Sequence, residues 1–247
     1  MTAISANLAL PEVPASLFRL GRLLNPCPAF DVFLPETANR HQVTQYIADQ
    51  FKSIHGANIH DFMPMLLSMQ CQGQFSAVSG VRPAARQPLF LEQYLGQAVE
   101  TVIRDVSGMA VERSKVVEIG NLVSTQKGAS QLLFLLLTAL LYRCDYQWVV
   151  FTGTPAVVKG LQRLGFKLDK LGAADPAMLK NSNLSEWGSY YQNRPRVVAG
   201  NVPAGMKVLQ SHKLYAGILE LLESQIDQLA PQFSKLDLPY GTHALAA

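Results

Sequence analysis

Hydrophobic and polar positions predict a strand–helix–strand unit at the centre of the chain, between Lys115 and Leu171. Lys115–Ser124 is rich in β-branched and apolar residues, and Tyr146–Thr152 has the same character, so both are predicted strands. Gln131–Tyr142, between them, is apolar nearly all round, which is typical of a helix buried against a sheet. Together these segments form a βαβ unit.

The unit continues through a further helix and strand. Thr154 occupies a favourable capping position, Pro155 suits the first position of a helix, and Gly165 provides its end. Lys167–Leu171 is the predicted strand that follows. The central segment therefore supplies three strands and two helices of an α/β domain.

The N-terminal half predicts a helix and a hairpin. Val43, Ile47 and Phe51 recur at i, i+4 and i+8 and define one apolar face of a helix over Thr37–Ile54. Three strands are expected before the central unit: Asp31–Leu34, and Met65–Gln70 with Phe75–Arg82 as the two strands of the hairpin. A helix is expected at Val99–Val106.

Towards the C-terminus we expect a turn at Gly200–Gly205 and one long helix over Lys207–Leu229 that packs on the body or on a second subunit of a homodimer. The prolines of the first 30 residues argue against regular structure there, and the last dozen residues after Pro231 are expected to form a frayed tail. The predicted organisation is an irregular segment over 1–30, a central domain over 31–205 and a helical extension over 206–247.

Composition limits the function. Apolar residues make up 49% of the 247 residues and charged residues 16%, and the net charge of +3 gives no reason to expect a nucleic-acid partner. Three widely separated cysteines fit neither a metal site nor a disulfide framework, which favours a cytoplasmic protein without a metal. The longest apolar run, Leu132–Tyr142, is too short to span a bilayer, so membrane contact is expected to be peripheral at most.

Two features of the central unit carry candidate chemistry. Glu118 lies within an otherwise apolar strand, where a carboxylate is costly to bury without a partner, so it is either functional or paired inside the protein. The turn Thr125–Ser130 precedes a helix and offers backbone N–H groups, with Gly128 permitting close approach and Lys127 adding positive charge. This turn is a candidate anion site.

The order of elements over Lys115–Leu171, including Leu161-Gln-Arg-Leu-Gly-Phe166, resembles the acyl-donor half of the GNAT N-acyltransferase superfamily. A more extensive similarity, from about Arg40 to Gly205, is to the thermostable hemolysin family, itself thought to be similar to GNAT enzymes and to acyl-homoserine lactone synthases. Five blocks carry it: His60-Asp-Phe-Met-Pro-Met-Leu-Leu, Leu89-Phe-Leu-Glu-Gln-Tyr-Leu, Val117-Glu-Ile-Gly-Asn-Leu, Trp148-Val-Val-Phe-Thr-Gly-Thr and Trp187-Gly-Ser-Tyr-Tyr.

The resemblance implies an α/β (α+β) fold with a mixed central sheet, helices on both faces and a C-terminal helical extension. It also implies transfer of an acyl group, long-chain fatty acyl groups included, from a thioester to a small-molecule amine. Because Thr125-Gln-Lys-Gly-Ala-Ser130 departs from the acetyltransferase loop at its first and last positions, acyl-CoA and acyl carrier protein both remain open as donors. The roles implied are Glu118 as base, Tyr190 or Tyr191 as acid for the leaving thiolate, Lys127, Gly128, Ala129 and Ser130 for the donor phosphate, and Glu92, Asn121 and Trp187 for the acceptor.

Each residue also has a structural alternative. Glu92 could pair with an arginine such as Arg113, Asn121 could satisfy the strand end, and Trp187 with the tyrosines could be a cluster at the edge of the core. Two other functions remain open for the chain: a membrane-active lytic protein acting through Lys207–Leu229, and a GNAT-like fold used only for binding.

Overall fold

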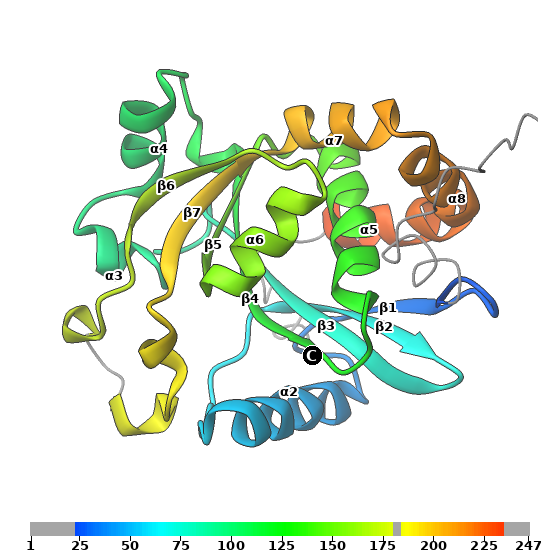
Figure 1. The fold of residues 1–247 in the computed structure, drawn as a ribbon, viewed down its shortest axis with the longest axis horizontal. Coiled ribbons are helices and arrows are strands. Elements are labelled where there is room, and N and C mark those ends of the chain that lie inside the picture. Colours follow the sequence, from blue (N-terminus) through cyan, green and yellow to red (C-terminus); the bar gives the residue numbers. More distant parts are fainter. Residues whose placement is uncertain (1–22, 180–183, 235–247) are drawn as a thin grey trace, which may run out of the picture.

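One mixed seven-stranded sheet organises the protein. The computed structural model describes residues 23–179 and 184–234, and in this part the strand order is β1-β2-β3-β4-β5-β7-β6 (Figure 1). All neighbouring strands are antiparallel except β4 and β5, which are parallel. The strands are β1 (Ala29–Phe33), β2 (Met65–Cys71), β3 (Gln74–Pro83), β4 (Val116–Ser124), β5 (Trp148–Gly153), β6 (Leu168–Ala173) and β7 (Arg196–Asn201).

Alternation along the strands divides the core between two faces of the sheet. In β2, Met65, Leu67 and Met69 face one hydrophobic cluster, whereas Leu66 faces another. The predicted hairpin joins β2 to β3, and its turn residues Gln72 and Gly73 both have positive φ. A turn of this backbone handedness matches the twist of the paired strands.

Helices cover both faces, as the resemblance implies (Figure 1). One face carries the helices that follow β4, β5 and β7, and the other carries the helices of the N-terminal half. The first group is α5 (Ala129–Arg143), α6 (Pro155–Arg163), α7 (Val202–Ser211) and α8 (Lys213–Ser234); the second is α2 (Arg40–His55), α3 (Glu92–Leu95) and α4 (Val99–Ser107).

The central unit is confirmed, with α5 as its buried helix. Leu132, Leu133, Leu136 and Leu140 are fully buried between the sheet and the C-terminal helices. The structure thus explains why this helix is apolar on nearly every side.

The C-terminal prediction is wrong in two respects. Gly200–Gly205 is not a turn: β7 continues to Asn201, and α7 begins at once at Val202. The single helix expected over Lys207–Leu229 is two helices that meet at His212, and the second extends through Pro231 to Ser234. The Asn201 side chain caps α7 by accepting from the Ala204 N–H, which ends the strand and starts the helix in consecutive residues.

Strand β7 was not predicted, because the residues just before it, 185–193, are mostly hydrogen-bonding and aromatic and obscure its short apolar run. It lies between β5 and β6 with antiparallel neighbours on both sides. The predictions for residues 1–22 and for the tail over 235–247 lie outside the described residues.

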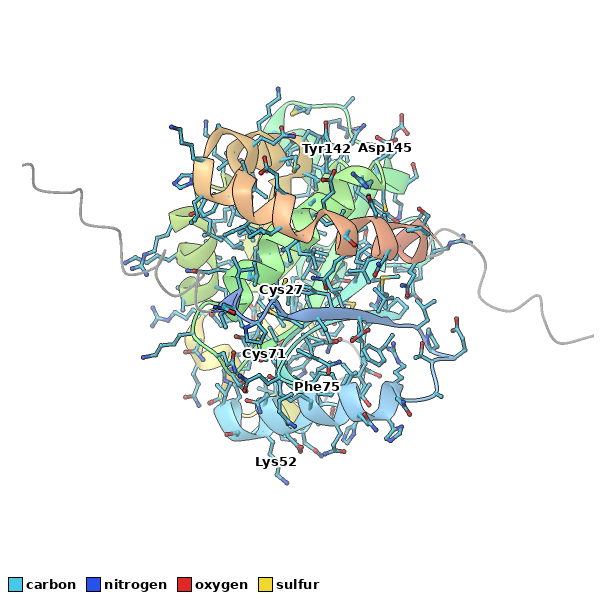
Figure 2. All side chains as sticks on the ribbon, turned by 90° about the vertical axis from the view of Figure 1, so that its right-hand side faces the viewer. Cys27, Lys52, Cys71, Phe75, Tyr142 and Asp145 are labelled. Atoms are coloured by element: carbon cyan, nitrogen blue, oxygen red, sulfur yellow. The ribbon has the colours of Figure 1, made fainter. Side chains whose placement is uncertain are left out.

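The N-terminal strand is attached to the last helix, as seen in Figure 2. Gln225 of α8 accepts from the Phe30 N–H and donates to the Pro28 carbonyl. Cys27 is exposed beside this contact, and none of the three cysteines forms a disulfide.

The sheet opens between β4 and β5. Their parallel pairing runs from Val116–Trp148 to Ile119–Phe151 and stops there, although β4 continues to Ser124. The carboxyl halves of these strands therefore diverge at the middle of the sheet.

Candidate functional site in the β4–β5 split

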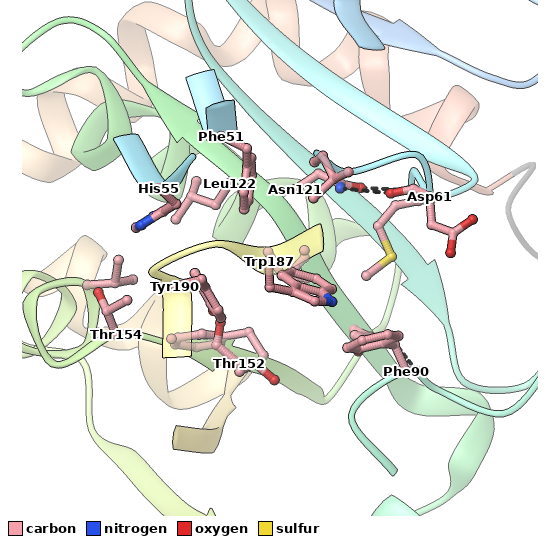
Figure 3. A pocket seen from close by; sticks show the side chains of 18 of the residues that line it. Phe51, His55, Asp61, Phe90, Asn121, Leu122, Thr152, Thr154, Trp187 and Tyr190 are labelled. Atoms are coloured by element: carbon pink, nitrogen blue, oxygen red, sulfur yellow. Dashed lines mark hydrogen bonds between the residues drawn. The ribbon is translucent and has the colours of Figure 1, made fainter. Parts of the chain in front are cut away.

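A cavity of about 360 Å³ occupies the place where β4 and β5 diverge. Consecutive β4 residues from Glu118 to Leu122 form one wall, and Phe151–Thr154 forms the other. The end of α2 and the segment Leu184–Asn193 contribute the remaining sides, as Figure 3 shows for His55, Trp187 and Tyr190. Its volume is in the range of small-molecule sites.

Glu118 is the buried carboxylate of this cavity, with 3% of its surface exposed. Its carboxylate accepts from the Phe90 N–H at 2.9 Å and from the Leu91 N–H at 3.0 Å. The Arg82 guanidinium lies 3.8 Å away on the paired strand β3. Burial raises the pKa of Glu118 to about 7, and the opposing effects of Arg82 and the two N–H groups are smaller. A carboxylate with this pKa can take up and release protons at neutral pH.

Aromatic rings form one side of the cavity. Ring centroids of Trp187 lie 5.8 Å from Phe90, 5.5 Å from Tyr190 and 5.8 Å from Tyr191. Phe90 also contacts Tyr94 at 5.9 Å, so rings from two distant segments form a continuous wall. The rings form a cluster at the edge of the core, as the structural alternative states, and the same rings also line the cavity.

The two candidate tyrosine acids differ in their hydrogen bonds. Tyr190 donates its hydroxyl to the Thr152 carbonyl at 3.3 Å, and the hydroxyls of Tyr191 and Tyr94 share a hydrogen bond of 2.5 Å. Burial raises the pKa of Tyr190 and of Tyr191 above the ordinary phenol value. Both hydroxyls therefore keep their protons at neutral pH and are suited to hydrogen bonding.

The residue that shapes β4 is Asn121. Its φ of 48° coincides with a shift in the β3–β4 register, and its side chain accepts from the Met63 N–H at 2.7 Å and donates to the Asp61 carbonyl at 3.3 Å. Asn121 lies in the cavity wall and also fastens the segment before β2 (Figure 3). Its structural role is shown by these bonds.

Residues 34–206 match the family described as thermostable hemolysin, which is most of the chain. The chain belongs to the thermostable hemolysin family. No curated protein matched the sequence.

Solved structures with a similar fold are acyl-transferring enzymes by description. FeeM, an N-acyl amino acid synthase from uncultured soil microbes, is 12% identical with a TM-score of 0.50, over 74% of this chain and 96% of its own. The acyl-homoserine lactone synthase LasI is 14% identical with a TM-score of 0.49, over 71% of this chain and 90% of its own. At these identities the likeness concerns the fold.

In this thermostable hemolysin family member, the structure does not bring Glu92 to the cavity. Its carboxylate accepts from Arg113 at 2.6 Å and from the N–H groups of Leu89 and Val99. Arg113 also pairs with Glu100 at 2.7 Å. Burial would raise the pKa of Glu92, but these hydrogen bonds lower it below its ordinary value. The structural alternative, pairing with Arg113, is the one observed.

The loop Lys127–Ser130 lies past the end of β4, outside the cavity wall formed by Leu122 and Phe134. Gly128 has a φ of 94° and precedes the first residue of α5, as its expected role at the helix start requires. The Ala129 N–H donates to the Gln126 carbonyl at 3.1 Å, so this group of the expected anion site is already used within the loop.

Sequence reasoning missed several residues of the site. His55 is half-buried in the cavity, and its ring lies 5.4 Å from that of Tyr190. Arg82, Phe90 and Tyr94 also line the cavity and were not predicted. Arg82 could have been found, because a charged residue at the end of an apolar strand is unusual. Among the described residues, no group of three or more metal-ligating side chains could hold a metal ion.

Proposed function

We propose that this protein is an N-acyltransferase that moves an acyl group from a thioester to an amine. The observation that carries the proposal is Glu118: a carboxylate with a pKa of about 7 at a cavity in the split of the sheet. An amine attacks a thioester only after it loses a proton, and a base with a pKa near the operating pH serves this step well.

In the proposed reaction, Glu118 takes the proton of the attacking amine. The nitrogen–carbon bond forms, the carbon–sulfur bond of the thioester breaks, and the departing thiolate takes up a proton. Tyr190 and Tyr191 remain the candidate donors to the sulfur, with protonated Glu118 as the source from which the proton is replaced. Thr152 Oγ1 and Arg82 Nε are buried without a hydrogen-bond partner at this cavity, so they are further candidates for positioning substrate.

The donor is proposed to be acyl-CoA or acyl carrier protein, with the phosphate at Lys127 and the N–H groups of Gly128 and Ser130; the Ala129 N–H could join them only by giving up its hydrogen bond to Gln126. BjaI, another solved structure with a similar fold, is described as a CoA-dependent acyl-homoserine lactone synthase with SAM and isopentyl-CoA. Within the described residues, the β4 edge beyond Ile119 has no neighbouring strand on the β5 side. An extended donor arm carrying amides can pair with such an edge.

A second cavity supports a fatty acyl donor. It measures about 690 Å³, lies between α5, α7 and the sheet, and is lined mostly by apolar side chains. Ile119, Phe134 and Phe151 belong to the walls of both cavities. An acyl chain attached to a carbonyl beside Glu118 would extend past these three residues into apolar surroundings.

The hemolysin description of the family suggests membrane lysis, but no specific observation favours it. The apolar face of α8 is occupied by α5, and no helix in the described part of the chain is long and apolar enough to cross a bilayer.

Thermal unfolding with a panel of CoA, acyl-CoA and acyl carrier protein tests the donor site. We expect stabilisation that increases with acyl chain length, and we expect Lys127→Glu to weaken it because the phosphate loses a cation. Lys213→Glu makes the same charge change at an exposed position on α8 and should leave it unaltered. If neither acyl-CoA nor acyl carrier protein stabilises the protein, the proposal is contradicted.

A further inference from the structure

We propose that the acceptor is a cationic amine without a carboxylate, such as a diamine or an arylalkylamine, held by the aromatic wall and by acidic side chains at the cavity rim. This inference rests on the proposed acyl transfer and specifies its acceptor.

The aromatic wall has the composition of a cation site. Phe90, Tyr94, Trp187, Tyr190 and Tyr191 all line the cavity, and each lies within 6 Å of at least one other ring. An ammonium group over the face of such rings is attracted by their quadrupoles, most strongly by tryptophan and tyrosine. Trp187 lies at the centre of this wall in Figure 3.

The charged side chains around the rings also favour a cation. The described lining contains the carboxylates of Asp61, Glu118 and Glu186 and only one guanidinium, that of Arg82. Burial lowers the pKa of His55, so this imidazole stays neutral at physiological pH and adds no positive charge. An ammonium group therefore enters a cavity whose charged side chains are mostly negative.

An amino-acid acceptor would require a partner for its carboxylate. Arg82 carries the one guanidinium of the described lining, and its charge lies 3.8 Å from Glu118, which it partly offsets; its Nε, which has no hydrogen-bond partner, is the group left to contact substrate. A bound carboxylate would also lie close to the carboxylate of Glu118, at a cost that rises with burial. The site thus favours an amine that lacks this group.

The chemistry of such an acceptor balances. One primary ammonium group gives a proton to the carboxylate of Glu118, and its neutral nitrogen then attacks the thioester carbonyl. As the amide bond forms and the carbon–sulfur bond breaks, the nitrogen loses a second proton; of the two protons, one is taken up by the departing thiolate and one is released to solvent. The products are an N-acyl amine and a thiol. In a diamine, the second ammonium group keeps its charge and stays at the aromatic wall.

Matched acceptor pairs provide the test. The full-length protein is assayed with one acyl thioester and tyramine against tyrosine, putrescine against ornithine, and agmatine against arginine, with amide product measured by mass spectrometry. Thermal shifts with the same six compounds in the absence of donor give a second readout. We expect each amine to exceed its amino acid in kcat/KM by about tenfold or more, which corresponds to the loss of one well-formed cationic contact or the addition of one repulsive one.

Variants locate the selectivity. Trp187→Leu and Asp61→Asn should each raise KM for the amines about three- to tenfold with a smaller change in kcat, because they remove binding that is the same in ground and transition states. Glu36→Gln removes an exposed carboxylate outside the cavity and should change neither value.

The outcomes separate the two proposals. Acylation of the amino acids equally or better would overturn the cationic-amine inference and leave acyl transfer intact. If no acceptor gives an amide product, the acyltransferase proposal is contradicted, and the thermal shifts alone decide the acceptor inference. Greater stabilisation by the amines than by the amino acids supports the inference, and equal or absent shifts overturn it.

Discussion

At the scale of the residue, the protonation of Glu118 is set by opposing effects. Burial disfavours its charge, while Arg82 and the Phe90 and Leu91 N–H groups favour it, and burial prevails. The raised pKa means that the folded protein binds a proton more tightly than the unfolded chain between about pH 4.5 and 7. Glu118 therefore lowers the free energy of unfolding as pH rises through this window, which is a cost of keeping a base at this position.

Glu118 could be identified from sequence because a carboxylate in an apolar strand is conspicuous. Trp187, Tyr190 and Tyr191 were found as a motif, and Asn121 as a polar residue in the same strand. Phe90, Tyr94 and His55 could not be found in this way. Their part in the cavity depends on how the end of α2, the loop before α3 and α3 itself come together over the sheet, and neither spacing nor composition contains that information.

At the scale of the element, the segment Leu184–Asn193 is attached to the end of α2. The Asn58 N–H donates to the Glu186 carbonyl at 2.6 Å, and the Ser189 N–H donates to the His55 carbonyl at 2.8 Å. Gly188 lies between these contacts with a φ of 51°, and a Cβ there would lie 2.0 Å from the His55 carbonyl oxygen. The close approach of Gly188 to His55 is between two backbone segments, so no flexible side chain can move to make room.

Gly188→Ala should therefore displace the segment that carries Trp187 and Tyr190. We expect a loss in unfolding free energy of about 2 kcal/mol or more and a raised KM for the acceptor. Gly96→Ala is the matched control, because its φ of 70° carries the same backbone strain but a Cβ there meets nothing within 4 Å. Equal losses for the two variants, with unchanged KM, would show that the segment is not held by this contact; thermal melts and acceptor kinetics decide.

The success of fold prediction varied with the strength of the local signal. The central βαβ unit, α2 and the β2–β3 hairpin were predicted because each has a clear period and its own turn residues. The break between α7 and α8 was missed because apolar residues continue across His212 with helical spacing. Strand β7 was missed because its apolar part, 197–199, is only three residues long and follows a segment rich in hydrogen-bonding and aromatic residues.

At the scale of the whole molecule, the C-terminal helices belong to the core. Leu222 and Phe233 of α8 are fully buried in the cluster that contains α5, and Gln225 links the same helix to β1. The lytic hypothesis requires this helix to present its apolar face to a membrane, and that face is covered by the protein itself.

Phe233→Ala should lower the unfolding free energy by about 3–5 kcal/mol, because it leaves a cavity in a packed core. Leu221→Ala, on the same helix but 66% exposed, should change it by no more than about 0.5 kcal/mol. Denaturant unfolding of both variants checks the pair. A small effect of Phe233→Ala would mean that α8 is not integral to the fold.

The most direct test of the central claim is the pH dependence of amide formation from an acyl thioester and an amine, in the wild-type protein and in Glu118→Gln. We predict that the wild-type rate rises with pH through about 7, as Glu118 loses its proton. In Glu118→Gln the step near pH 7 should disappear, leaving only the rise that comes from ionisation of the amine, and the rate should fall about 10²–10⁴-fold, the usual contribution of a general base. Ionisation of the amine itself affects both proteins alike. A folded variant that retains the wild-type rate and the rise near pH 7 would contradict the account.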